Sequence, residues 1–144
     1  MLDRQWIASH IPHQGRMCLL DTVLEWTDQH IVCEANSHCA PDQPLRTADR
    51  LGSVVGVEYA AQAMAVHGAL LTAATDPPSQ GFLASVRNLR LHVDRLDDLC
   101  GPLQVRAERL SGDQRLVLYQ FHIHHQGHCL LDGRASVVLD AQAL

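Results

Sequence analysis

Lysine is absent from the 144-residue sequence, and all eleven cationic side chains are arginines. This absence excludes a Schiff-base lysine, the lysine of a nucleotide-binding P-loop and a Ser-Lys catalytic pair. The motifs G-x-G-x-x-G and G-x-S-x-G are missing as well, so the sequence implies no nucleotide cofactor and no nucleophilic-serine elbow.

Other residue classes are scarce or scattered. Aromatic residues make up 4% of the chain and hydrophobic residues 47%, which predicts one compact domain over residues 1–144 with an aliphatic core. The five cysteines include no C-x-x-C pair, so we expect reduced, buried thiols rather than a disulfide or metal framework. A formal net charge of −5 argues against general nucleic-acid binding. The first residues, MLDRQWIASHIPH, carry an acid and an arginine before any apolar run, which predicts no signal peptide and a cytoplasmic location.

The longest apolar run spans residues 50–74, RLGSVVGVEYAAQAMAVHGALLTAA. It is rich in alanine and glycine, contains no proline, and has one carboxylate, Glu58. Such a run predicts a helix that is apolar on nearly every face and is buried on all sides. Gly, His, Glu and Gln interrupt it too often for a membrane span, so no membrane association is predicted. A carboxylate in this helix is costly to bury unless it is paired or used, which makes Glu58 the first candidate for chemistry.

The rest of the chain has mainly strand patterns. One or two helical turns are expected over 3–10, followed by strands over 16–25 and 31–36 and by an irregular, proline-containing segment over 37–49. The long helix is expected to end near residues 76–78. Strands follow over 81–93, 103–110, 115–124 and 128–139, separated by short polar turns. This order predicts an α+β domain in which a curved antiparallel sheet wraps around one long central helix.

Three segments in this order resemble the hot-dog fold and, within it, the FabA/FabZ-type 3-hydroxyacyl-ACP dehydratases, with the ApeP-like branch of aryl-polyene pathways the most similar. They are IPHQGRMCLLDTVLEW (11–26), VEYAAQAM (57–64) and GFLASVRNLRLHVDRLD (81–97). The resemblance covers nearly the whole chain. It implies dehydration of 3-hydroxyacyl thioesters carried on the phosphopantetheine of acyl carrier protein, with no other cofactor. It also implies a homodimer, or a heterodimer with a related hot-dog subunit, in which the helix acid of one subunit faces the histidine of the other.

Dehydration needs an acid for the departing C3 hydroxyl and a base for the C2 proton, both in a dry tunnel. A carboxylic acid buried in an apolar helix can hold its proton near neutral pH, which suits Glu58 for the acid. In the family, a backbone amide five residues before the acid polarises the thioester carbonyl, and that position here is Ser53. Gln62 lies one turn beyond Glu58 on the same helix face. It is expected either to orient Glu58 or to satisfy backbone groups at a dimer seam.

The base departs from the family pattern, because counting back from Glu58 places the family's loop histidine at Pro44. Two histidines could substitute: His13, in the opening motif, and His38, if its loop folds back. We prefer His13 because Pro12 and Gly15 fix the backbone around it. The alternative is that His13 only forms hydrogen bonds in the core or at the tunnel rim.

The remaining polar candidates are weaker. His67 is expected to be a satisfied core or interface histidine and Tyr59 a packing residue. The cluster HIHHQGH (122–128) could bring imidazoles together, but it has no supporting ligand apart from Cys129, so we expect a solvated hairpin and no metal. By the resemblance, four arginines border the tunnel and could contact the carrier protein: Arg46, Arg50, Arg87 and Arg90.

The sequence therefore predicts a 3-hydroxyacyl-ACP dehydratase of fatty-acid or polyene-type synthesis. Two alternatives remain: a hot-dog acyl thioesterase, and a non-catalytic subunit that binds acyl-ACP, which the proline at position 44 favours. The acyl chain length and the pathway are not encoded in these motifs.

Overall fold

The alanine-rich run folds into α2 (Gly56–Leu71), preceded by one 3-10 turn, η3 (Ser53–Val55). Thr72 ends the helix with an extended backbone, and its N–H donates to the Gly68 carbonyl. The computed structural model describes residues 1–72, 81–113 and 115–138. The predicted helix end at 76–78 lies outside the described residues.

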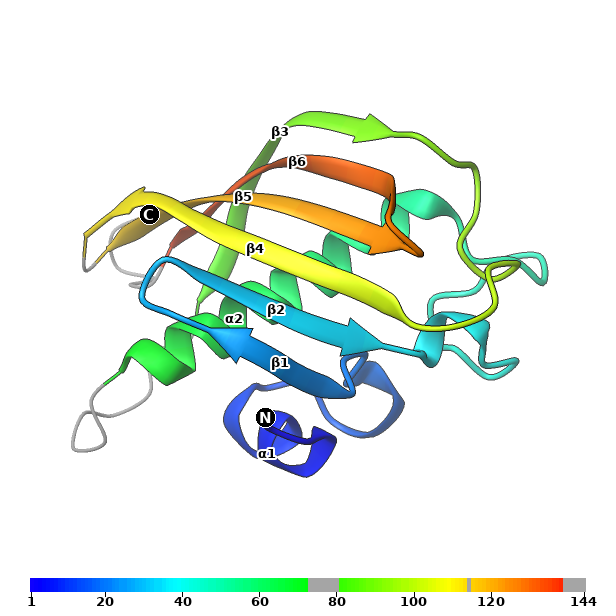
Figure 1. Ribbon diagram of the computed structural model, residues 1–144, viewed down its shortest axis with the longest axis horizontal. Helices are drawn as coiled ribbons and strands as arrows, with labels where there is room; N and C mark the ends of the chain where they lie inside the picture. Colours follow the sequence, from blue (N-terminus) through cyan, green and yellow to red (C-terminus); the bar gives the residue numbers. More distant parts are fainter. Residues whose placement is uncertain (73–80, 114, 139–144) are drawn as a thin grey trace.

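Six antiparallel strands form one sheet that curves over α2 (Figure 1). In spatial order they are β1 (Thr22–Trp26), β2 (His30–Ala35), β4 (Leu103–Gly112), β5 (Leu116–His125), β6 (His128–Val138) and β3 (Phe82–Leu91). The predicted α+β arrangement of a curved sheet around one long helix is confirmed. β3 is the next element after α2 in the chain but pairs with β6, so it forms one edge of the sheet.

The sheet presents alternate residues to α2. Ile31, Val105, Ile123 and Leu131 come from four strands, and all are fully buried on the inner face. Gly56 lies so close to this layer that an added Cβ would be 2.7 Å from a Leu131 methyl group. The start of α2 therefore packs directly onto the centre of the sheet.

The N-terminal segment covers the other side of α2. Helix α1 (Arg4–His10) forms as predicted, with Asp3 accepting a hydrogen bond from the Trp6 N–H as its N-cap. The strand predicted over 16–25 is wrong in its first half, since residues 15–17 form the 3-10 turn η1 (Gly15–Met17) and β1 begins at Thr22. Cys18, Leu19 and Leu20 are buried in succession, which the alternating pattern of a one-sided strand cannot provide.

The stretch Ser53–Leu71 has a mean hydropathy of 1.3 and passes a test of length and composition for a membrane span, as core helices of soluble domains also do. In this structure the helix α2 packs against the inner face of the curved sheet (Figure 1). Within the described residues all five cysteines are free thiols; Cys18 and Cys33 are buried, whereas Cys39 and Cys100 are exposed, so the prediction of buried thiols is wrong for those two.

Candidate active site

Glu58 and His13 are in contact. His13 lies on the loop between α1 and η1, and its Nε2 is 3.1 Å from Oε1 of Glu58, in the first turn of α2. The side chains are 27% and 36% exposed, so the pair is shielded but reachable. Nδ1 of His13 is buried and has no hydrogen-bond partner in the described part of the chain. The acid and the histidine that meet here belong to the same subunit. The family resemblance implied an acid and a histidine from different subunits.

A cavity of about 300 Å³ opens beside this pair. Its walls come from α2, from the start of β3, from the end of β6 and from the segment before η1. They are mainly apolar and include Pro12, Ala61, Met64, Ala65, Ala69, Phe82, Leu83 and Val137. Glu58 and His13 therefore face a mainly apolar pocket, in which His10 and Thr72 are the other polar lining residues. Such a pocket suits a reaction on a thioester with an aliphatic chain.

The prediction that α2 is buried on every side is wrong on the cavity face. Glu58, Ala61, Ala65 and Gly68 lie three or four residues apart along one stripe of the helix, and all are partly exposed. An added Cβ at Gly68 would meet no atom within 4 Å. The small residues of the run leave space next to the carboxylate, and this is where an acyl chain would fit.

Gln62 does not contact Glu58, so its predicted orienting role is wrong. Its Nε2 donates to the Met17 carbonyl at 2.7 Å, and its Oε1 accepts from the Leu19 N–H at 2.9 Å. The alternative, that Gln62 satisfies backbone groups, is correct in kind, but those groups belong to its own chain. Gln62 thus fixes the segment after His13 onto the helix that carries Glu58.

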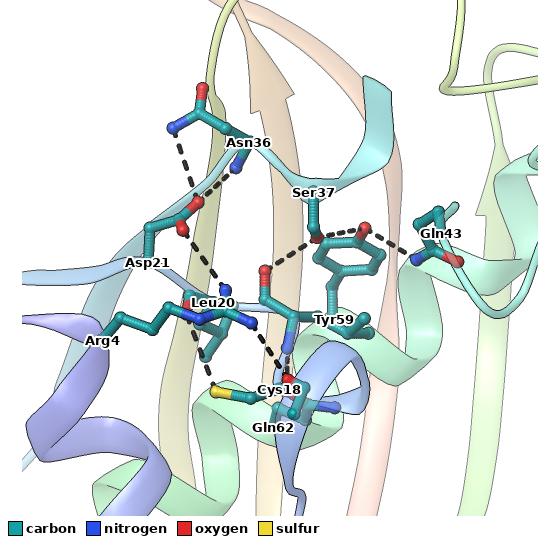
Figure 2. A network of polar contacts seen from close by, with 11 residues as sticks. Arg4, Cys18, Leu20, Asp21, Asn36, Ser37, Gln43, Tyr59 and Gln62 are labelled. Carbon is teal, nitrogen blue, oxygen red and sulfur yellow. Dashed lines mark hydrogen bonds and ion pairs between the residues drawn. The ribbon is translucent and has the colours of Figure 1, made fainter. Parts of the chain in front are cut away.

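A second set of hydrogen bonds holds the same segment, as Figure 2 shows. Gln43 Nε2 lies 3.1 Å from the Tyr59 hydroxyl, which lies 2.7 Å from Ser37 Oγ, and Ser37 donates to the Leu19 carbonyl at 2.8 Å. Tyr59, expected only to pack, is fully buried and also anchors this network. No local pattern in the sequence indicates this role, because the hydrogen-bond partners of Tyr59 lie 16 and 22 residues away.

The structure places His38 away from the cavity. It lies in the 3-10 turn η2 (Ser37–Cys39), is fully buried, and bonds through Nε2 to the Leu99 carbonyl at 2.9 Å. Burial lowers its pKa below the ordinary value of histidine. The loop does not fold back toward Glu58, so His38 as the base of this cavity is wrong.

The Ser53 amide is also engaged. Its N–H donates to the Asp94 carbonyl at 3.0 Å, and the residue is buried. The prediction that this amide polarises a thioester carbonyl is therefore wrong for this structure, since a donor already committed to Asp94 cannot also bind the substrate.

Two of the four arginines lie near the start of α2. Arg46 is a structural residue, because it donates to Asp97 at 3.1 Å and to the Ala40 carbonyl at 3.3 Å. Hydrogen bonds from Arg95, the Leu51 N–H and Arg46 hold the pKa of Asp97 well below its usual range. Arg50 is exposed and remains a candidate for carrier-protein contact.

Arg87 and Arg90 lie on the outer face of the sheet, opposite α2, so their predicted place at the tunnel mouth is wrong. In β3, Val86 pairs with Ala135, and both side chains are directed toward the core. A bulge at Asn88, with φ at 54°, puts both arginines on the other side. Arg90 is paired there with Asp132 at 3.0 Å.

His67 is a satisfied core histidine, as predicted. It is fully buried, with Nδ1 2.7 Å from the Tyr119 hydroxyl and Nε2 2.7 Å from the Thr27 carbonyl, and burial lowers its pKa. Of the hairpin histidines, His122 and His124 lie on the outer sheet face with ring centroids 5.8 Å apart, and His125 bonds to the Cys100 carbonyl.

The curved sheet around one helix, with an acid in the first helical turn beside an apolar cavity, defines a hot-dog protein. Among protein-family models, the ApeP-like family, described as ApeP dehydratase, matches residues 5–143. The chain belongs to this ApeP-like dehydratase family. No curated protein sequence matches the chain.

Solved structures share the fold. The dehydratase heterocomplex ApeI:P from Xenorhabdus doucetiae is 22% identical with a TM-score of 0.84, and the match covers 95% of this chain and 92% of that one. Zebra fish thioesterase superfamily member 2 is 14% identical with a TM-score of 0.64, and 95% of each chain is covered. The thioesterase SAV0944 from Staphylococcus aureus is 14% identical, with a TM-score of 0.60 and coverage of 81% and 90%. At these identities the matches support the fold, and the family assignment rests on residues 5–143.

Proposed function

We propose that the protein dehydrates 3-hydroxyacyl thioesters carried on acyl carrier protein to trans-2-enoyl thioesters. The observation that carries the proposal is the 3.1 Å contact between His13 Nε2 and Glu58 Oε1 at an apolar cavity of about 300 Å³. Membership of the ApeP-like dehydratase family supports the reaction class. The reaction belongs to fatty-acid or aryl-polyene-type chain synthesis in the cytoplasm.

Glu58 acts as the acid and His13 as the base. The imidazole Nε2 takes the C2 proton, the C2–C3 double bond forms, and the C3–O bond breaks as Glu58 protonates the departing hydroxyl, which leaves as water. This leaves an imidazolium next to a carboxylate. Because the two atoms are 3.1 Å apart, the proton passes from His13 back to Glu58 and both groups are ready for the next turnover.

The carrier protein delivers the thioester on its phosphopantetheine arm. Arg50, exposed just before η3, offers a cation for an acidic carrier or for the phosphate of that arm. Arg46 is already bound to Asp97, and the outer-face position of Arg87 and Arg90 removes them from the cavity side. Arg50 therefore remains as the carrier contact among the four arginines considered.

The test is an assay of the purified protein with 3-hydroxyacyl-ACP of medium chain length, in which enoyl product and thiol release are both followed. Enoyl thioester formation is the expected result. Release of thiol without enoyl product would instead indicate a thioesterase. No product in either channel, alone or with a related hot-dog subunit, would indicate a non-catalytic partner, consistent with Pro44 at the position of the family's loop histidine.

A second hot-dog subunit is proposed to pair with the edge strand β3. Within the described residues β3 has β6 as its single neighbour, and its side chains Phe82, Leu83 and Leu91 are 42%, 42% and 46% exposed. An apolar sheet edge of this kind is a site of pairing with another chain. The related complex ApeI:P is itself a heterocomplex, which supports a hetero-oligomer as well as a homodimer.

Leu83→Asp is expected to abolish this association, because a carboxylate would be buried in an apolar seam. Light scattering after size-exclusion chromatography would give the mass of the chain alone and of its mixture with a related hot-dog subunit. Leu110→Asp is the matched control, since Leu110 on β4 is 43% exposed. Assembly that tolerates Leu83→Asp as well as Leu110→Asp would refute β3 as the interface.

A further inference from the structure

A cluster of three possible metal ligands lies outside the cavity, on the outer face of the sheet. His92 directly follows β3, while Cys129 and Asp132 belong to β6. One donor atom from each residue lies within 4.8 Å of the other two. His92 Nε2 is 2.9 Å from Asp132 Oδ2, and Cys129 Sγ is 3.7 Å from the same oxygen. Neither Glu58 nor His13 takes part in this cluster.

A β-bulge creates the juxtaposition. Residues three apart in a regular strand point to opposite faces, so Cys129 and Asp132 would not meet. The register changes from Ile123 opposite Leu131 to His124 opposite Cys129, which leaves Leu130 as an extra residue of β6. The bulge brings the thiol and the carboxylate to one side. The spacing in the sequence therefore gave no sign of a carboxylate ligand near Cys129.

The three residues are held in place by the fold. The His92 N–H donates to the Leu130 carbonyl at 2.8 Å, which ties the end of β3 to the bulge. The side chain of Asp132 is 8% exposed, and Arg90 contacts its Oδ1 through Nε and Nη2, each at 3.0 Å. Oδ2 is thereby turned toward His92 and Cys129. A hydrogen-bonded outer shell of this kind orients the ligands of metal sites in proteins.

The spacing suits a tetrahedral ion. Bonds of roughly 2.0 to 2.3 Å place neighbouring tetrahedral ligands about 3.3 to 3.8 Å apart. The sulfur-to-oxygen distance of 3.7 Å already fits, and the 2.9 Å hydrogen bond between His92 and Asp132 needs only a small opening when a metal ion replaces its proton. A set of imidazole, thiolate and carboxylate donors selects Zn²⁺ over Mg²⁺ or Ca²⁺, which prefer oxygen ligands alone.

We propose that His92, Cys129 and Asp132 bind one Zn²⁺ ion, with water at the fourth position, on the side that the partly exposed His92 opens to solvent. The ion would link the end of the edge strand β3 to the start of β6. Its role is structural at the sheet edge and is independent of the proposed dehydration.

Binding can be tested on the reduced, chelator-treated full-length protein with Co²⁺ as the spectroscopic probe and Zn²⁺ as the competitor. We expect one Co²⁺ per chain, a thiolate-to-cobalt charge-transfer band that Zn²⁺ abolishes, and a higher midpoint of thermal unfolding with Zn²⁺ present. Cys129→Ser should remove the band, and Cys129→Ser and His92→Gln should each weaken Zn²⁺ binding about a hundredfold or more. Glu58→Gln should bind Zn²⁺ as the wild type does.

Two control variants make the assignment specific. Cys100→Ser removes an exposed thiol elsewhere, and His128→Gln removes an exposed imidazole of the neighbouring hairpin. Both should retain the band and the affinity. Any one of three results would overturn the proposal. They are a charge-transfer band that survives Cys129→Ser, metal binding that is lost in His128→Gln but kept in His92→Gln, and the absence of saturable binding by the folded wild type.

Discussion

Glu58→Gln is expected to lower kcat for enoyl formation by about a thousandfold, because it removes the proton that the departing hydroxyl needs. The amide is nearly isosteric with the acid, and its NH2 can donate a hydrogen bond to His13 Nε2, which lies 3.1 Å from Glu58 Oε1 in the wild-type protein. The fold and substrate affinity should therefore change little. Single-turnover measurements with 3-hydroxyacyl-ACP would separate the chemical step from binding.

Glu108→Gln is the matched control, since it makes the same change at an exposed residue of β4. It should retain wild-type kcat. If Glu58→Gln were equally active, Glu58 would not be the acid and the dehydratase proposal would lose its central residue.

The contact between the two side chains also predicts how their substitutions combine. His13→Ala should reduce kcat strongly, and the double variant should be little worse than either single variant, because the residues act as one proton-transfer unit. Additive losses would mean that they act independently. Activity that survives His13→Ala would move the base to His10, which also lines the cavity, or to another subunit, since His38 is bonded to Leu99 at a separate place in the fold.

The fold could be predicted from the sequence because its signals are local. The alanine-rich run before a series of turn-bounded strands fixed the order of α2, β3, β4, β5 and β6, and the structure moves their boundaries by only a few residues. The strand prediction is wrong over residues 16–21 because Gln62, a distant side chain, forms the hydrogen bonds of this buried backbone that a neighbouring strand would otherwise form. A periodicity argument contains no information about such a partner.

The candidate site could be predicted in part, because a carboxylate within an apolar helix is unusual and draws attention to its position. Glu58 is the one carboxylate of the run, and Pro12 and Gly15 indicate a rigid backbone around His13, so both residues can be identified from the sequence alone. The positions of Arg90 and Asp132 could not be predicted from the sequence, because two β-bulges decide which face of the sheet each side chain lies on. A one-residue change of register reverses every later assignment in a strand.

Gln62 is the polar residue of α2 whose loss we expect to destabilise the protein most, because its side chain satisfies two backbone groups of the segment after His13. Gln62→Met keeps the length of the side chain but leaves the Leu19 N–H and the Met17 carbonyl without the partners at 2.9 and 2.7 Å. Each unsatisfied buried group costs roughly 1–3 kcal/mol, so the free energy of unfolding should fall by about 2 to 4 kcal/mol. Urea denaturation followed by circular dichroism would measure the change.

Gln104→Met is the control, since Gln104 is exposed on β4, and its unfolding free energy should stay within about 0.5 kcal/mol of wild type. Because Gln62 fixes the segment that follows His13, folded Gln62→Met should also lose activity through a displaced imidazole while Glu58 stays in place. Amide hydrogen exchange should then rise over residues 11–19 and remain slow in β5 and β6. Wild-type stability together with unchanged exchange over 11–19 would show that Gln62 does not hold this segment, and the contact between His13 and Glu58 would need another support.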